Sequence, residues 1–139
     1  GWSTSGPRRD GTAWPIGVQD PRGGDWPLTV LLLTSGGVAT SGRDYRRWRQ
    51  GNAERHHIID PRTGMPAETD LLSVTVVAAR VAEAEIAAKA VLILGSDAGL
   101  AWLRARPWLA GLLVRTDGAV LRTQTLEPFL WSDGGKELR

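Results

Sequence analysis

The chain has 139 residues, of which 42% are hydrophobic and 23% charged, and its formal net charge is +2. This balance predicts one globular domain, residues 1–139, with a sizeable core. The lack of cysteine excludes disulfides, thiolate metal sites and a cysteine nucleophile, and no apolar run approaches the roughly 20 residues that span a bilayer. Because the sequence does not begin with methionine, we interpret it as part of a longer protein, and its location, cytoplasmic or membrane-associated and extracytoplasmic, is left open.

The first part of the chain predicts short strands separated by loops. Residues 1–13 are rich in Gly, Ser, Pro and charge and are interpreted as a loop or a ragged end. Short apolar stretches predict strands at "AWPIGVQD" and at Leu28–Thr34. The turn residues "SGG" then lead into "VATSG", which predicts a β-hairpin.

The second part predicts a strand, two helices and a hairpin. Leu71–Ala79 is rich in β-branched residues, as strands are. The stretch "VAEAEIAAKAVLILG" predicts a helix that ends at Gly95, and "SDAGLAWLRARP" predicts a second helix with Ser96 or Asp97 as its N-cap. The Asp-Gly pair in "AGLLVRTDGAVLRT" predicts a hairpin, whereas residues 124–139 are interpreted as an irregular tail. Helices segregated from hairpins indicate an α+β fold, a mainly antiparallel sheet with two helices packed on it.

The basic segment "RDYRRWR", Arg43–Arg49, interleaves arginine with Tyr45 and Trp48. Such a stripe is typical of nucleic-acid binding. A solvated strand edge is the simpler interpretation, and contact with the phosphates of a small ligand is a third. We therefore expect no nucleic-acid partner.

Both histidines of the chain lie in "HHIIDPRTG", His56–Gly64. The Asp-Pro pair favours a turn by itself. Asp60 also lies close enough in sequence to orient the imidazole of His57 and fix its tautomer, as a general base requires. Arg62 adds a planar cation suited to phosphate, and Thr63 adds a hydroxyl. From these residues alone, a structural histidine is favoured over a catalytic one, and both interpretations stay open.

Lys89 is the only charged residue from Ile86 to Leu94, and Glu85 precedes it by four positions. This is the favourable order for an ion pair on a helix. Because the surroundings are apolar, we expect the pair to be at least partly buried. The Lys89 ammonium then either extends to the surface, which we favour, or is placed for a function.

Several segments together resemble a known family. The stretches "WPIGVQDP", "SGGVATSG", "HIIDPRTG", "SVTVVAA" and "AEAEIAAKAVLILG" follow one another in the chain and resemble the C-terminal part of the FAD:protein FMN transferases, the ApbE family. The resemblance implies an ApbE-like, T-fold-related fold, incomplete relative to the full family fold. It also implies an enzyme that takes FMN from FAD, attaches it to a Thr hydroxyl of an acceptor flavoprotein and releases AMP, assisted by Mg²⁺.

The segments that supply most of the family's FAD pocket are not found in this sequence. We therefore expect little activity from the chain alone. A non-catalytic relative that binds flavin or a partner is the alternative, and a homodimer is left open.

The resemblance implies roles for five residues. His57 would accept the proton, and Asp60 would orient the imidazole of His57. His56 has no implied role. The family's flavin contacts correspond to Ile59, Thr63 and Ser41.

Two further positions correspond to the family's magnesium ligands, an Asp and a Thr. Here they are Glu85 and Lys89. A glutamate oxygen can bind Mg²⁺, but a protonated ammonium has no lone pair to offer. Either Lys89 neutralises phosphate in place of the ion, or the metal site is lost.

Overall fold

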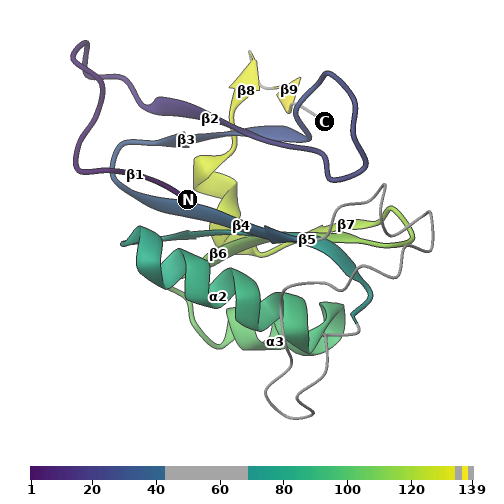
Figure 1. Ribbon diagram of the computed structural model, residues 1–139. Helices are drawn as coiled ribbons and strands as arrows, with labels where there is room; N and C mark the ends of the chain where they lie inside the picture. The colour runs from purple at the N-terminus through teal and green to yellow at the C-terminus, as the bar shows by residue number, and fades with distance from the viewer. Residues whose placement is uncertain (43–68, 134–135, 138–139) are drawn as a thin grey trace.

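The computed structural model describes residues 1–42, 69–133 and 136–137. In this part of the chain, two α-helices cover one face of a five-stranded sheet, and a two-stranded sheet lies over the other face (Figure 1). All neighbouring strands of the main sheet are antiparallel. This arrangement confirms the α+β fold with a mainly antiparallel sheet and two packed helices.

The strands of the main sheet, in the order in which they lie side by side, are β1 (Trp2–Thr4), β4 (Gly36–Gly42), β5 (Leu71–Ala78), β6 (Ala110–Arg115) and β7 (Val120–Arg122). The remaining elements are β2 (Trp14–Val18), β3 (Thr29–Leu33), α2 (Val81–Leu94), α3 (Ser96–Arg104), the 3₁₀ helix η1 (Gln124–Phe129), β8 (Ser132–Asp133) and β9 (Lys136–Glu137). In the described part of the chain, no helix is both long enough and apolar enough to cross a membrane.

The core under the helices depends on small side chains of α2. Ala84, Ala87 and Ala88 are buried in the same cluster as Val76 of β5. Alanine side chains let a helix axis approach a sheet closely. Gly37 of β4 makes this contact closest, because a Cβ atom there would lie 2.4 Å from the backbone nitrogen of Val81. The first turn of α2 therefore rests directly on the backbone of β4.

The opposite face of the main sheet packs against β3 and η1. Val77 of β5 and Leu112 of β6 share a buried cluster with Leu31, Leu33 and Leu126. Side chains alternate between the two faces of a strand. β5 is therefore buried on both faces, which explains why it reads as a nearly continuous apolar run.

The predicted hairpin between the segments on either side of "SGG" is wrong. β3 pairs with β2, whereas β4 pairs with β1 and β5 in the other sheet. Gly36 has a φ of +110°, and a Cβ atom there would lie 2.7 Å from the carbonyl oxygen of Ala78. The turn residues correctly indicate that the chain changes direction. Here, however, the turn leads from the two-stranded sheet to the five-stranded sheet.

Both ends of the chain hold more regular structure than predicted. The expected loop over residues 1–13 begins with β1, in which Trp2 lies opposite Val38 of β4. The expected irregular tail begins with η1, whose Leu126 is fully buried. Both elements depend on partners distant in sequence, and local composition carries no sign of these partners.

Two local predictions are confirmed. Gly95 ends α2 with a φ of +87°. The β6–β7 hairpin forms around the Asp-Gly turn, where Gly118 has a φ of +92°. In each case glycine supplies a left-handed conformation that other residues adopt at a cost.

Candidate functional site

Most of the residues implied as a site by sequence lie outside the described residues. These are the catalytic candidates and two of the flavin contacts, His57, Ile59, Asp60 and Thr63. The basic segment Arg43–Arg49, for which a solvated strand edge was the simpler interpretation, also lies outside the described residues. Their roles stay predictions. The structure does describe the two strands that this part of the chain connects, β4 and β5.

The connection starts and ends at neighbouring points. Gly42, the last residue of β4, lies opposite Ser73 of β5. A Cβ atom on Gly42 would lie 2.7 Å from the carbonyl oxygen of Leu72, so the two strands are in close contact up to this point. On the β5 side, the Leu71 N–H donates to Thr69 Oγ1 at 3.3 Å. The described residues that flank 43–68 therefore lie at one end of the main sheet, on or next to its neighbouring strands β4 and β5.

Asp70 joins three elements at this end of the sheet. Its Oδ1 accepts a hydrogen bond from the Ser96 N–H at 2.8 Å, and its Oδ2 accepts one from the Ser96 hydroxyl at 2.5 Å. Its carbonyl oxygen accepts the Thr116 N–H at 2.8 Å, in the β6–β7 turn. Asp70 thereby ties the start of β5 to the first residue of α3 and to a second strand connection.

This arrangement corrects the predicted cap of α3. Gly95 is the N-cap and makes no side-chain cap hydrogen bond. Ser96 is the first helical residue and is 3% exposed, while the exposed Asp97 takes no part in this pair of bonds. The Ser96 N–H is satisfied by a carboxylate 26 residues earlier in the chain, so no local motif could indicate it.

The charge of Asp70 is stabilised by its surroundings. Desolvation opposes ionisation and is the largest single effect, but hydrogen bonds from the Ser96 hydroxyl and N–H and the charge of Arg115 together outweigh it. The pKa of Asp70 is consequently held below its usual value. Arg115 also pairs with Asp117 at 2.9 Å. Its Nε is buried without a hydrogen-bond partner in the described part of the chain, which leaves one donor at this end of the sheet unused.

Ser41 is the implied flavin contact that the structure describes. It lies on β4 opposite Val74 and is half-buried. Ala39, two residues earlier on the same face of the strand, belongs to the core under the helices. Ser41 therefore lies on the helix-covered side, next to the point where residue 43 begins. A flavin contact there stays a prediction.

The expected partial burial of Glu85 and Lys89 is wrong. Both residues are exposed on α2, and the Glu85 side chain is 52% exposed, with Oε1 3.8 Å from the amino group of Gly1. The buried face of α2 is formed by other positions, and even the apolar Ile86 between them is 70% exposed. The apolar composition of this helix thus misled the prediction, because part of it faces outward.

Magnesium does not fit the described residues by themselves. They contain no group of three or more His, Asp or Glu side chains that could hold a metal ion. Glu85 offers carboxylate oxygens on the outer face of α2, but Lys89, one helical turn later, offers no lone pair. Mg²⁺ prefers near-octahedral oxygen coordination, which one exposed carboxylate does not provide.

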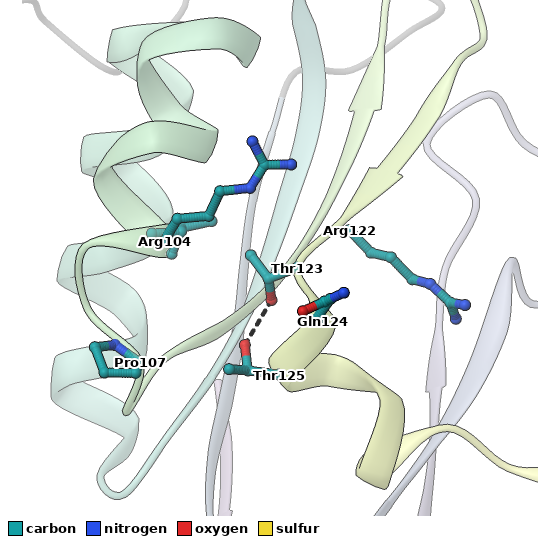
Figure 2. Close-up of a pocket in the computed structure, with 7 residues that line it drawn as sticks. Arg104, Pro107, Arg122, Thr123, Gln124 and Thr125 are labelled. Atoms are coloured by element: carbon teal, nitrogen blue, oxygen red, sulfur yellow. Dashed lines mark hydrogen bonds between the residues drawn. The ribbon is translucent and has the colours of Figure 1, made fainter.

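A separate pocket of about 410 Å³ lies between the end of α3, the end of β7 and the start of η1. Figure 2 shows Thr123 and Thr125 facing each other on one side and Arg104 on the other, while Arg122 points away. Thr125 donates its hydroxyl hydrogen to the Leu109 carbonyl at 2.8 Å, so Thr123 must donate in the 2.7 Å bond between the two hydroxyls. Both hydroxyl hydrogens are therefore engaged in hydrogen bonds within the protein.

This pocket is remote from the attachment of residues 43–68. Thr123 Oγ1 accepts the Gly111 N–H at the start of β6, whereas Arg115 at the far end of β6 lies opposite Leu71. The pocket and Asp70 thus lie at opposite ends of the main sheet, and the pocket is not part of the site implied by sequence.

Comparison with known proteins identifies relatives for most of the chain. The ApbE family model matches residues 2–113. A FAD:protein FMN transferase of Treponema pallidum is 38% identical over 108 residues, which cover 77% of this chain and 30% of the relative. That of Salmonella typhimurium is 31% identical over 136 residues, covering 94% of this chain and 38% of the relative.

Solved structures give the same result. The ApbE protein of Thermotoga maritima matches with a TM-score of 0.74 and 35% identity, over 91% of this chain and 41% of that protein. The flavin transferase ApbE of Vibrio cholerae matches with a TM-score of 0.72 and 28% identity, over 90% of this chain and 40% of that protein. The chain thus spans 30% to 41% of the length of these four relatives.

Proposed function

Because this chain belongs to the ApbE family, we propose that it is the C-terminal portion of a flavin transferase. The reaction would move FMN from FAD to a threonine hydroxyl of an acceptor flavoprotein. The threonine oxygen attacks the phosphorus of the FMN half, the pyrophosphate P–O bond breaks, and AMP leaves. The observation that carries this proposal is the match to the family model over residues 2–113.

The proposed roles follow from what phosphoryl transfer requires. The attacking hydroxyl must be positioned, its proton removed and the phosphate charge neutralised. We assign proton removal to His57 and the orientation of its imidazole to Asp60. Flavin binding is assigned to Ser41, Thr63 and the backbone at Ile59. The attachment of residues 43–68 beside Ser41 supports this grouping, because it brings Ser41 and the start of the segment to the same end of the sheet.

Charge neutralisation is the part of the proposed reaction in which this chain departs from what the resemblance to the family implies. Since the described residues do not form a magnesium site, we assign no step to a metal ion. Lys89 carries a positive charge on the exposed face of α2, one turn from Glu85. In the proposal, this ammonium stabilises phosphate charge directly. Lys89→Thr, which exchanges the ammonium for a hydroxyl oxygen, should then make transfer more dependent on added Mg²⁺.

The test compares the two adjacent histidines in the complete gene product. FAD and an acceptor peptide are supplied, and covalent FMN is measured by mass spectrometry. His57→Ala should abolish transfer, because the proton acceptor is lost, whereas the matched control His56→Ala should transfer at a rate near that of the parent. If both variants transfer FMN equally, the role assigned to His57 is wrong.

A non-catalytic relative is the second candidate function. It is favoured by Lys89, which takes the place of an expected metal ligand but cannot ligate a metal. The two functions are separated by FAD binding, followed by flavin fluorescence. Binding of FAD by the parent protein without any covalent transfer, with and without Mg²⁺, would favour the non-catalytic relative.

A further inference from the structure

We propose that the pocket between the end of α3, the end of β7 and the start of η1 binds a small organic anion that also carries a hydroxyl or amino group. The anionic group pairs with Arg104, and the hydroxyl or amino group donates a hydrogen bond to Thr125. This second site lies at the opposite end of the main sheet from Asp70, and it does not rest on the proposed function.

The pocket has the size and the walls of a small-molecule site. Its volume is about 410 Å³, and ligand pockets in proteins span about 300–1,000 Å³. Leu103 and Pro107 form its apolar wall. The polar lining comes from two arginines, two threonines and a glutamine, namely Arg104, Arg122, Thr123, Gln124 and Thr125. A few polar groups that converge on a partly apolar hollow can fix the orientation of a small ligand.

The fold holds the walls of the pocket in place. A Cβ atom on Gly111 would lie 2.5 Å from Leu103 Cδ1, so β6 packs directly against the apolar wall. The buried Thr123 is joined to Gly111 by two hydrogen bonds of 3.0 Å, one from the Thr123 N–H to the Gly111 carbonyl and one from the Gly111 N–H to Thr123 Oγ1. Because these walls are already ordered, a ligand would bind with a smaller loss of conformational entropy.

Arg104 is the cation of this pocket that the fold leaves free. It is the last residue of α3 and is exposed, and its guanidinium makes no ion pair or hydrogen bond with any residue of the described ranges. Two nearby arginines are engaged. Arg122 pairs with Glu127 at 2.7 Å, while Arg106 lies 3.9 Å from the centre of the Trp102 ring. Since a guanidinium presents a planar fork of donors that matches carboxylate and phosphate, Arg104 is the position for the anionic group.

The two threonines determine which group of the ligand lies beside them. Thr123 donates to Thr125 Oγ1 at 2.7 Å, and Thr125 donates to the Leu109 carbonyl at 2.8 Å. The half-buried Thr125 oxygen therefore keeps a lone pair but offers no hydrogen. A carboxylate or phosphate oxygen would meet only lone pairs there, whereas a ligand hydroxyl or amine can donate to it. Figure 2 shows Arg104 on the other side of the pocket, so the ligand needs both groups.

Arg104 has a simpler role that needs no ligand. A cation in the last turn of α3 interacts favourably with the negative end of the helix dipole. That role involves neither threonine, and it gives no reason for the protein to bind anions with a hydroxyl more tightly than anions without one. Binding measurements with matched ligands therefore separate the two interpretations.

The experiment is isothermal titration calorimetry of the complete gene product. Malate and glycerol 3-phosphate each combine an anionic group with a hydroxyl, and they differ in whether the anion is a carboxylate or a phosphate. Succinate and propyl phosphate are the matched controls, because they lack the hydroxyl groups. We expect at least one hydroxylated probe to bind with a Kd of about 1 mM or lower. Its matched control should bind about threefold to tenfold more weakly, because one hydrogen bond is lost.

Three variants test whether the binding occurs in this pocket. Arg104→Gln removes the charge of an exposed side chain and should weaken binding by about tenfold to a hundredfold. Arg9→Gln removes the same charge from an exposed arginine outside the lining and should leave Kd within about twofold of the parent value. Thr125→Val removes the acceptor oxygen and should reduce the preference for the hydroxylated probe. Should Thr125→Val fail to fold, the matched ligands test the same contact in the parent protein.

The outcomes separate the proposed site from its alternatives. If neither hydroxylated probe binds at about 10 mM, or if Arg104→Gln and Arg9→Gln weaken binding equally, the proposal is wrong. Equal affinity for a hydroxylated probe and its matched control overturns the role given to Thr125 and the proposed ligand class. Binding of malate alone identifies a carboxylate ligand and binding of glycerol 3-phosphate alone a phosphate ligand, and either supports the proposal when Arg104→Gln weakens it. None of these results involves FMN transfer, so failure here leaves the proposed function intact.

Discussion

Gly37 should tolerate no side chain, because the first turn of α2 lies against its backbone. An added Cβ atom would lie 2.4 Å from the nitrogen of Val81, 2.5 Å from its Cα and 2.9 Å from the carbonyl carbon of Arg80. Non-bonded carbon atoms prefer about 3.5–4.0 Å. Gly37→Ala therefore requires a separation of at least about 1 Å between β4 and α2.

The free-energy cost of Gly37→Ala depends on which atoms the added Cβ atom would contact. All three belong to the backbone, so no side chain can rotate away and the start of the helix must move. A gap of about 0.5–1 Å loses a quarter to a half of the dispersion energy of the atoms that face it, and Ala84, Ala87 and Ala88 of α2 lie in the core. Overpacking typically costs about 1–3 kcal/mol, and we expect Gly37→Ala to lie near about 3 kcal/mol.

Urea unfolding followed by circular dichroism measures this cost. With an m-value of about 2 kcal/mol per M, the midpoint of Gly37→Ala should fall by about 1.5 M. Gly6→Ala is the matched control, because a Cβ atom there meets nothing within 4 Å and Gly6 has no positive φ. Its stability should change by less than about 1 kcal/mol. Equal midpoints for the two variants would refute the direct contact between helix and strand.

Three further perturbations test other parts of the fold by the same urea assay. Because the pKa of Asp70 is lowered from 3.8, its charge stabilises the fold in full above that pH, and this contribution is lost as the pH falls through the lowered value. The urea midpoint of Asp70→Asn should therefore fall less steeply below about pH 4 than that of the parent, and parallel curves would contradict the assignment. Leu113→Ala, at a fully buried position under the helices, should cost about 3–5 kcal/mol, and a cost below about 1 kcal/mol would show that the core collapses around the missing atoms. Gly118→Ala places a β-carbon at a φ of +92° and should cost about 1–2 kcal/mol, whereas an unchanged midpoint would show that the turn adopts another conformation.

Local elements of this fold could be predicted from the sequence, because their signals are local. The β-branched run of β5, the alanine-rich α2 ending at Gly95 and the Asp-Gly turn before β7 each contain their own evidence. Strand pairing contains none. The turn between β3 and β4 has the residues of a hairpin, and only the presence of β2, β1 and β5 decides that each strand pairs elsewhere.

Less of the candidate site than of the fold could be predicted from the sequence. The motif that carries His57 is recognisable as a sequence, but the contact between Asp70 and Ser96 is not. Asp70 and Ser96 are 26 positions apart, and neither is part of a motif that would predict their contact. The partial burial expected for Glu85 and Lys89 was wrong, although the Lys89 ammonium was expected at the surface, because hydrophobic composition does not reveal which face of a helix the sheet covers.

The attachment of residues 43–68 at Gly42 and Thr69 has a consequence for how such chains can change. Gly42 is the last residue of β4, and Thr69 lies two residues before β5. Because β4 and β5 are paired in the sheet, the frame does not depend on the length of chain that joins them. Doubling the length of a connection costs only about 0.6 kcal/mol in closure entropy. Insertions, deletions or exchange of this segment between relatives can therefore occur while the sheet, its two helices and their core are inherited unchanged.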